Sequence, residues 1–425
     1  MATNTDIPQG YKATALGIIP QEWEVKTLGN IAEINPSKGK ITSKVVTFLA
    51  MSDISEQGGV INENILPIDS IKPGLTPFRK GDVIIAKITP CFENGKGALL
   101  DKITEDDGFG STEFHVIRCQ QDNKFVYYHT QSYAFRKRLE SQMTGSAGQK
   151  RVPADSVAAY KIAVPPLAEQ RKIAEVLGVW DEAIEKQARL IEKLALRKRA
   201  LMQRLLSAKL RLPGFSEPWE KVKLGDIGHF LSSNTLSRDC LNEQIGNIKN
   251  IHYGDILIKL PTIVDASFIH IPYVNDDVIV KSDYLKNGDI IFADTAEDYT
   301  VGKAIEIINI QAIPVTSGLH TIPFRPKSGI FVNRFLGYYV NSTDYRRQLQ
   351  PLIQGIKVYS ISKTALCKTT LKIPTLSEQT AIAEVLTAAD REIELAKEKL
   401  ERLRRQKRGL MQQLLSGKKR VKINI

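Results

Sequence analysis

Apolar residues recur with helical spacing in two long segments of the chain, residues 166–210 and 376–420. In both segments they return mostly every three or four positions. This heptad seam predicts one long amphipathic helix in each segment, roughly 60 Å long at about 1.5 Å per residue. The seam positions are Ile173, Leu177, Trp180, Ile184, Ile191, Leu194, Leu201 and Leu205 in the first helix, and Ile382, Leu386, Ile393, Leu400, Leu403, Leu410 and Leu414 in the second.

The two helical segments are copies of one unit. Glu169–Leu177 reads EQRKIAEVL and Glu378–Leu386 reads EQTAIAEVL. The segments also end alike, with LMQRLLS at Leu201–Ser207 and LMQQLLS at Leu410–Ser416. Both pairs are separated by 209 residues. A constant offset indicates an internal duplication, and two copies indicate a pseudo-dimer within one chain.

One polar interruption of the seam repeats as well, since Lys198 in the first helix returns as Lys407 in the second. Two seams in one register are complementary surfaces. A globular block lies between the helices and must return the chain, so we expect them to pair as an antiparallel coiled coil. The alternative is two unrelated amphipathic surface helices, which would need neither a shared register nor shared ends.

A mixed segment with short apolar runs precedes each helix, and the two mixed segments share a framework. These features predict two similar α/β domains of about 150 residues each, in a chain whose 425 residues allow two or three domains. The matching features are, in chain order, the openings with Leu-Gly at Trp23 and Trp219, the Gly-Asp turns at 81–82 and 288–289, the His-bearing strands at 114–117 and 319–322, the aromatic, Arg-bearing helices at 125–140 and 335–350, and the glycine-containing loops at 145–151 and 355–360.

The sequence therefore predicts an α+β protein in four blocks. The blocks are a first domain at 1–165, a helix at 166–210, a second domain at 211–375, and a helix with a basic tail at 376–425. The stretches between the shared features diverge, as a comparison of residues 35–44 with residues 232–244 shows. One frame with different loops indicates one task performed on different targets.

Composition adds a charge argument. The chain has 59 Lys and Arg against 47 Asp and Glu, a formal net charge of +12, which favours polyanionic partners. Charge alone does not separate such a protein from a basic protein that binds no nucleic acid. Four widely spaced cysteines, without a CxxC pair, favour a reduced, cytosolic protein without structural zinc: Cys91, Cys119, Cys240 and Cys367. No apolar run is long enough to span a membrane, and MATNTDIPQG lacks the features of a signal peptide.

Sequence motifs for catalysis are missing. The chain has no GxxxxGK[ST] loop, HExxH or GxSxG motif, no G-x-G-x-x-G between a strand and a helix, and no Asp/Asn-Pro-Pro-aromatic motif of amino-methyltransferases. His115 and His320 fall in apolar strands, where we expect hydrogen-bonded core histidines, not metal ligands. These observations favour a binding protein without a catalytic or metal site.

The doubled pattern resembles the specificity (S) subunit of type I restriction-modification systems. Its elements are Pro-x-x-Trp with Leu-Gly-x-Ile, a variable α/β region, Pro-x-x-x-Glu-Gln-x-x-Ile-Ala-x-Val-Leu and a long helix. Here the openings are Pro20–Trp23 and, with different spacing, Pro213–Trp219, and the helix starts are Pro165–Leu177 and Pro374–Leu386. The resemblance covers nearly the whole chain.

The resemblance implies two target recognition domains, each binding one half of a split sequence in double-stranded DNA. The helices would act as a conserved spacer and as the docking surface for two modification (methyltransferase) subunits. Restriction (endonuclease/translocase) subunits would join the assembly. S-adenosylmethionine would belong to the methyltransferase partner, so that this chain would be non-catalytic and carry no cofactor of its own.

DNA contacts are expected from loop residues beside the shared strands. Lys and Arg suit phosphates, whereas Gln, Asn, Arg and hydroxyl side chains can read base edges. The candidates are Lys87, Lys96, Gln149, Lys150 and Arg151 in the first domain, and Lys303, Lys357, Tyr359 and Ser360 in the second, with Lys38, Lys40 and Lys44 as further candidates in a variable stretch.

Two other functions stay open at the level of sequence. One is a DNA methyltransferase or nuclease with degenerate motifs, which would bind S-adenosylmethionine, or cut or methylate DNA, without a partner. The other is a coiled-coil scaffold that does not bind DNA. The close repeat of the helices beside divergent domain loops favours DNA recognition, because a pure scaffold would not need variable loops.

Overall fold

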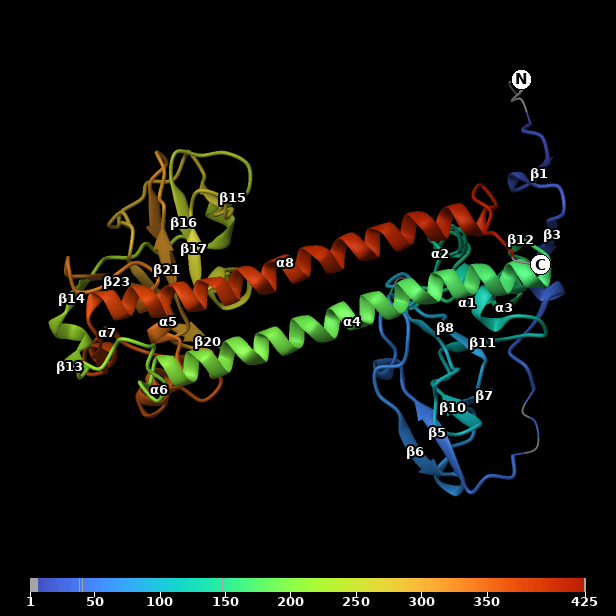
Figure 1. Cartoon of the computed structure of the whole chain (residues 1–425), viewed down its shortest axis with the longest axis horizontal. Helices are drawn as coiled ribbons and strands as arrows, with labels where there is room; N and C mark the ends of the chain where they lie inside the picture. The colour runs from blue at the N-terminus through green and yellow to red at the C-terminus, as the bar shows by residue number, and fades with distance from the viewer. Residues whose placement is uncertain (1–6, 38, 40, 147, 424–425) are drawn as a thin grey trace. The chain divides into compact units, whose positions relative to one another are not determined.

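The computed structural model describes residues 7–423 except 38, 40 and 147. The chain divides into two compact units. Unit 1 comprises residues 1–187 and 399–425, and unit 2 comprises residues 188–398. Each unit contains one mixed domain together with part of both long helices (Figure 1).

Both predicted long helices are present. Helix α4 spans Leu167–Leu205 and helix α8 spans Leu376–Leu415, with 39 and 40 residues. The first half of α4 and the second half of α8 belong to unit 1, and the other two halves belong to unit 2. Within each unit the beginning of one helix therefore accompanies the end of the other, which is an antiparallel arrangement (Figure 1).

Apolar side chains of both helices share hydrophobic clusters within each unit. In unit 1, Ile173 and Leu177 of α4 lie in one buried cluster with Leu414 of α8. In unit 2, Leu194 of α4 lies in a cluster with Ile393 of α8. Burial of each such side chain contributes about 1.5–3 kcal/mol to the stability of the folded chain. The remaining seam side chains are buried at Leu205, Ile382, Leu386 and Leu400 and half-buried at Trp180, Ile184, Ile191, Leu201, Leu403 and Leu410.

The mixed domain of unit 1 contains two four-stranded sheets and two strand pairs. The sheet that carries the candidate site has the order β4 (Ala32–Ile34), β11 (Phe114–Cys119), β8 (Val83–Ala86), β9 (Gly97–Leu99). The second sheet has the order β6 (Asn64–Pro67), β5 (Val45–Leu49), β10 (Asp107–Gly110), β7 (Thr76–Arg79). The pairs are β1 (Tyr11–Thr14) with β2 (Gly17–Pro20), and β3 (Glu24–Thr27) with β12 (Lys161–Val164).

Unit 2 repeats this framework. Its five-stranded sheet has the order β14 (Gly228–Phe230), β23 (Thr321–Pro326), β19 (Ile290–Ala293), β21 (Ala304–Ile308), β17 (Ile263–Asp265). A four-stranded sheet has the order β15 (Leu241–Asn242), β18 (Tyr273–Val274), β16 (Lys249–Ile251), β22 (Val315–Ser317). The pairs are β13 (Glu220–Lys223) with β25 (Thr370–Ile373), and β20 (Thr295–Ala296) with β24 (Tyr359–Ser360).

The predicted Arg-bearing helices are each two helices, which corrects the single spans expected from the sequence. Unit 1 has α1 (Asn123–Gln131) and α2 (Tyr133–Glu140), and unit 2 has α5 (Phe335–Val340) and α6 (Thr343–Leu349). A serine with extended backbone separates the helices of each pair. Ser132 Oγ accepts a hydrogen bond from Phe135 N, and Ser342 Oγ accepts one from Tyr345 N, so each serine caps a new helix. Two short helices complete the α-helices of the described residues, α3 (Ala154–Ala158) and α7 (Lys363–Cys367).

The predicted match between His115 and His320 is wrong by two residues, because the strand position of His115 is occupied by Ile322 in unit 2. In β11, Phe114 pairs with Ala86, whereas in β23 it is Thr321 that pairs with the corresponding Ala293. His320 therefore precedes its strand, has a φ of 54° and is 46% exposed at its side chain. It is not the core histidine that we expected.

His115 does behave as a core histidine. It is buried, and its Nε2 donates a hydrogen bond to the Val152 carbonyl over 2.8 Å. Burial lowers its pKa, so the ring is neutral near pH 7.

Candidate nucleic-acid interface

In unit 1 the candidate residues gather where β8 ends. The chain continues from β8 through Lys87, and the loop 145–151 runs back beside it. Val152 N donates to Lys87 O, and Thr89 N donates to Lys150 O, both over 2.9 Å. The structure thus brings Lys87, Lys150 and the neighbouring Gln149 and Arg151 together. Gln149 and Lys150 are exposed.

Unit 2 builds the same arrangement where β19 ends. Strand β20 pairs with β24, which aligns Thr295 with Ser360, and Ile361 N donates to Asp294 O over 2.9 Å. The Tyr359 ring stacks on Tyr299 with ring centres 4.9 Å apart. Lys357 is exposed in the loop before β24. The predicted residues Lys357, Tyr359 and Ser360 therefore occupy one loop that corresponds to the loop 145–151.

Arg151 is engaged by a neighbouring carboxylate. Its Nε and Nη2 donate to Glu113, with the closest contact at 2.8 Å. These bonds lower the pKa of Glu113 and keep it ionised. Part of the positive charge of Arg151 is therefore already balanced, whereas Lys150 carries an exposed charge on the same loop.

Lys96 and Lys303 occupy equivalent positions and direct their ammonium groups to backbone carbonyls. Lys96 Nζ donates to Met51 O, and Lys303 Nζ donates to Leu257 O, each over 2.9 Å. Burial lowers the pKa of Lys303. These bonds tie each lysine to a neighbouring segment of its own domain, and a phosphate contact by either lysine stays a prediction.

Among the additional lysines, Lys44 is exposed just before β5, and Lys38 and Lys40 lie outside the described residues.

An arginine supports the loop behind each site, buried in unit 1 and half-buried in unit 2. Arg136 of α2 donates to Thr130 O, Phe92 O and Gly95 O over 2.8–3.2 Å. Burial lowers its pKa to about 10, so it remains charged at neutral pH. Arg346 of α6 donates in the same way to Tyr299 O and Val301 O over 2.6 and 3.0 Å. These guanidinium groups position the loops that follow β8 and β19. The sequence alone did not predict this role of the two arginines.

A buried glutamate joins each domain to the helix pair. Glu169 at the start of α4 accepts from Trp23 Nε1 over 3.0 Å and from Arg420 over 2.6 and 2.9 Å. Glu378 at the start of α8 accepts from Trp219 Nε1 over 3.1 Å and from Arg211 over 2.6 and 2.8 Å. Both carboxylates are 1% exposed. In each unit, the Trp of the opening motif and the Glu of the Glu-Gln motif are thus hydrogen-bond partners. Because each arginine follows the end of the other long helix, the contact also fixes the antiparallel pair.

A second junction lies further along the helices. In unit 1, Tyr128 of α1 donates its hydroxyl hydrogen to Asp181 of α4 over 2.7 Å. Lys407 of α8 also donates to Asp181 and lies 5.2 Å from the centre of the Tyr128 ring. Burial and the neighbouring carboxylate raise the pKa of Tyr128, so its hydroxyl stays protonated and donates.

Unit 2 repeats this junction. Tyr338 of α5 donates to Asp390 of α8 over 2.7 Å, and Lys198 of α4 donates to the same carboxylate. The Lys198 ammonium lies 5.3 Å from the centre of the Tyr338 ring. The two lysines that interrupt the heptad seam therefore have one shared role.

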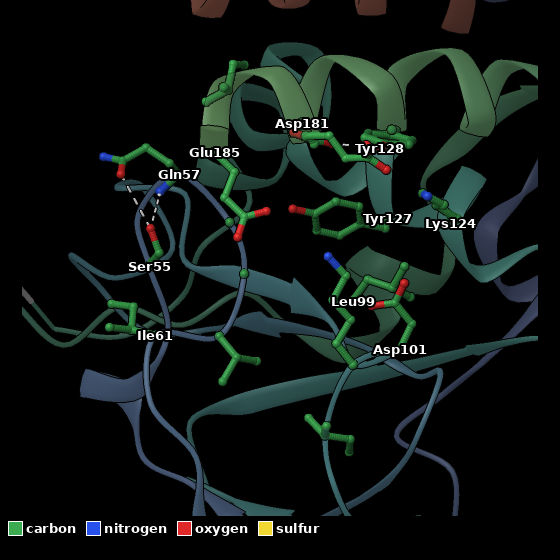
Figure 2. A pocket seen from close by; sticks show the side chains of 18 of the residues that line it. Ser55, Gln57, Ile61, Leu99, Asp101, Lys124, Tyr127, Tyr128, Asp181 and Glu185 are labelled. Carbon is green, nitrogen blue, oxygen red and sulfur yellow. Dashed lines mark hydrogen bonds between the residues drawn. The ribbon is translucent and has the colours of Figure 1, made fainter. Parts of the chain in front are cut away.

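A cavity of about 680 Å³ opens beside the junction of unit 1, between the loop 55–63, α1 and α4 (Figure 2). The Tyr127 hydroxyl and the Glu185 carboxylate point toward one another across it, and Lys124 lies at its edge. Its wall carries side chains of both charges.

Within the described residues, no group of three or more His, Cys, Asp or Glu side chains is placed to hold a metal ion. Nor does any described helix have the length and apolar character needed to cross a membrane.

Comparison with protein families gives one match over both repeats. The model of the type I restriction modification DNA specificity domain matches residues 20–195 and 216–405.

Individual relatives agree with this match. The chain is 42% identical over 160 residues to the type I restriction enzyme EcoAI specificity subunit of Escherichia coli, which covers 36% of this chain and 27% of that relative. The chain thus spans only about a quarter of the length of this relative. It is 28% identical over 424 residues to the type I restriction enzyme MjaVIII specificity subunit of Methanocaldococcus jannaschii, covering 95% and 94% of the two chains.

A solved structure has the same fold. It comes from work on complex assembly and conformational transition of the type I R-M system, and it superposes with a TM-score of 0.62. The match covers 94% of this chain and 99% of the solved chain at 19% sequence identity. At that identity the likeness shows the fold alone.

Proposed function

This chain belongs to the type I restriction modification DNA specificity domain family, and from this premise we propose that it is the DNA-recognition subunit of a type I restriction-modification complex. Each domain binds one half of a bipartite target in double-stranded DNA. The chain itself is non-catalytic, binds no cofactor and works in the cytoplasm. The observation that carries the proposal is the pair of equivalent loops, 145–151 and 355–360, which hold the same place on one framework but differ in sequence.

The proposed domain boundaries are those expected from the sequence. Residues 1–165 and 211–375 form the two target recognition domains. Residues 166–210 and 376–425 form the spacer helices, the second with a basic tail. Lys87, Lys150 and Lys357 contact phosphates, which fixes the position of each domain on the duplex. Base reading falls to Gln149 in the first domain and to Tyr359 and Ser360 in the second. Arg151, Lys96 and Lys303 are further contacts if DNA displaces their present partners.

The spacer helices also dock two methyltransferase subunits, and restriction subunits join that assembly. Exposed apolar side chains on the helices support such a docking surface, because they are apolar contacts available to a partner. They are Val179, Leu190 and Leu196 on α4 and Leu376 and Leu395 on α8, which are 44–62% exposed. S-adenosylmethionine belongs to the methyltransferase partner.

Methylation-site sequencing tests the proposal. DNA from cells that carry this chain with its methyltransferase partner should be modified at one split motif with a fixed spacer. Modification by the purified chain alone, or binding of S-adenosylmethionine to it, would favour an enzyme instead. Absence of DNA binding even with the partner present, or binding without salt dependence, would favour a scaffold.

A further inference from the structure

The loop that precedes β24 in unit 2 ends in an apolar tip. Ile356 is 92% exposed and Val358 is 53% exposed, on either side of Lys357. Tyr299, stacked beneath on Tyr359, is 66% exposed. The corresponding loop of unit 1 instead presents the polar side chains of Gln149 and Lys150. The equivalent loops of the two domains therefore differ in the side chains they expose, which include apolar ones in unit 2 and are polar in unit 1.

The tip is held firmly at its base. Gln354 and Ser360 exchange backbone hydrogen bonds of 3.0 and 2.8 Å, and β24 pairs with β20. Gly355 has a φ of +108°, and a Cβ on it would lie 1.9 Å from Val358 O. Only glycine allows so tight a loop at this position. The backbone contacts at the base of the loop therefore hold Ile356 and Val358 in their exposed positions.

The carboxylates beside the tip disfavour phosphates next to its apolar side chains, which leaves Lys357 as the phosphate contact proposed for this loop. Glu297 and Asp298 are exposed in the loop after β20, which pairs with the strand at the base of the tip. Hydrogen bonds from Thr300 lower the pKa of Asp298 and keep it ionised. Carboxylates repel the DNA backbone but accept hydrogen bonds from the cytosine amino group in the major groove. These surroundings favour base edges as the surface opposite the tip.

Resting on the proposed function, we propose that Ile356 and Val358 contact the C5-methyl group of thymine in the major groove. The half-site of the second domain then contains at least one A·T pair that is recognised through its methyl group. Apolar side chains are suited to this contact, which distinguishes thymine from the other bases. An apolar wedge between bases would be different, because wedging does not depend on the methyl group.

The test uses the complex of this chain with its methyltransferase subunits and duplexes that carry the motif found by methylation sequencing. Each thymine of both half-sites is replaced singly by deoxyuridine, which removes only the methyl group. One replacement in one half-site should weaken binding about four-fold, the effect of exposing one methyl group. Ile356→Ser or Val358→Ser should remove that methyl dependence. Ile61→Ser, at a 67% exposed position of unit 1, should retain it and serves as the matched control.

The outcomes separate the inference from the proposed function. A bipartite motif whose recognition is insensitive to every deoxyuridine would overturn the inference and leave the function standing. So would methyl dependence that survives both serine variants. Failure to find a bipartite motif would overturn both.

Discussion

Lys407 of α8 binds Asp181 of α4, and 209 residues earlier Lys198 of α4 binds Asp390 of α8. Each lysine occupies a position where the seam would otherwise continue with an apolar side chain. Polar residues in a coiled-coil seam specify register at some cost in stability. Here each carboxylate also accepts from a tyrosine of the adjoining domain, so one contact sets helix register and domain orientation together.

We expect Lys407→Ala to lower the free energy of unfolding by about 1–2 kcal/mol, because it removes a hydrogen bond between charged groups from a half-buried site. Urea titration followed by circular dichroism measures this change. Arg408→Ala, one residue away and exposed, should change stability by less than about 0.5 kcal/mol. Equal losses for the two variants would argue against the junction.

Glu169→Gln should lower the free energy of unfolding by about 2 kcal/mol, because the neutral amide cannot balance Arg420 as the carboxylate does. Glu378→Gln should have a similar effect through Arg211 in unit 2. Tryptophan fluorescence during urea unfolding reports on both sites, since Trp23 and Trp219 donate to these carboxylates. Glu175→Gln, on the exposed side of α4, is the control. The idea would be wrong if this control lost as much stability as the buried variants.

Glu306 gives unit 2 a pH-dependent stability. Burial raises its pKa to about 7, outweighing the hydrogen bonds from the Arg334 and Gly337 backbone nitrogens. Between pH 4.5 and 7 the folded chain thus holds a proton that the unfolded chain has released. Its contribution to stability is fully present below pH 4.5 and is lost as pH rises through about 7.

Glu306→Gln removes this titration. Urea unfolding between pH 5 and 8 should therefore show a smaller fall in stability for the variant than for the native chain. Parallel curves for the two proteins would contradict the buried, protonated state of Glu306.

For DNA binding, Lys150→Ala should weaken association with all sequences and reduce the slope of log K against log salt by about one. Binding of the complete methyltransferase complex at several salt concentrations measures both effects. Lys137→Ala provides a matched control, because Lys137 is exposed on α2 and paired with Glu140. An unchanged slope in Lys150→Ala would remove this residue from the interface.

Gln149→Ala should behave differently from Lys150→Ala. If Gln149 reads a base edge, the variant should relax preference at one position of the motif and keep the salt slope. Methylation-site sequencing with the variant measures this. Loss of preference at every position would indicate a disturbed loop instead.

Periodicity was enough to predict the long helices and the shared framework, because a duplicated pattern with a constant offset reports on both copies at once. It failed where a single position decides the outcome. The strand register around His320 depends on which residue pairs with Ala293. The apolar pattern is compatible with either neighbour of His320, Leu319 or Thr321, and the structure has Thr321. The breaks at Ser132 and Ser342 likewise depend on one serine cap within an otherwise helical pattern.

The long-range contacts were beyond sequence reasoning for a different reason. Arg420 and Glu169 are 251 residues apart, and no local pattern relates them. The repeat itself carried a usable signal, because Arg211 stands 209 residues before Arg420, as Glu169 does before Glu378. Residues on the loops proposed to face DNA differ between the copies, so the repeat could not identify them.

The division of unit 1 into two distant segments also sets an order of assembly during synthesis. Residues 188–398 leave the ribosome as one uninterrupted stretch, so unit 2 has all of its parts while unit 1 still lacks residues 399–425. Until then Glu169 is without Arg420, and the apolar face of early α4 is without Leu414. The first domain to be translated is thus the last to be completed, and it depends on the nascent chain remaining intact until then.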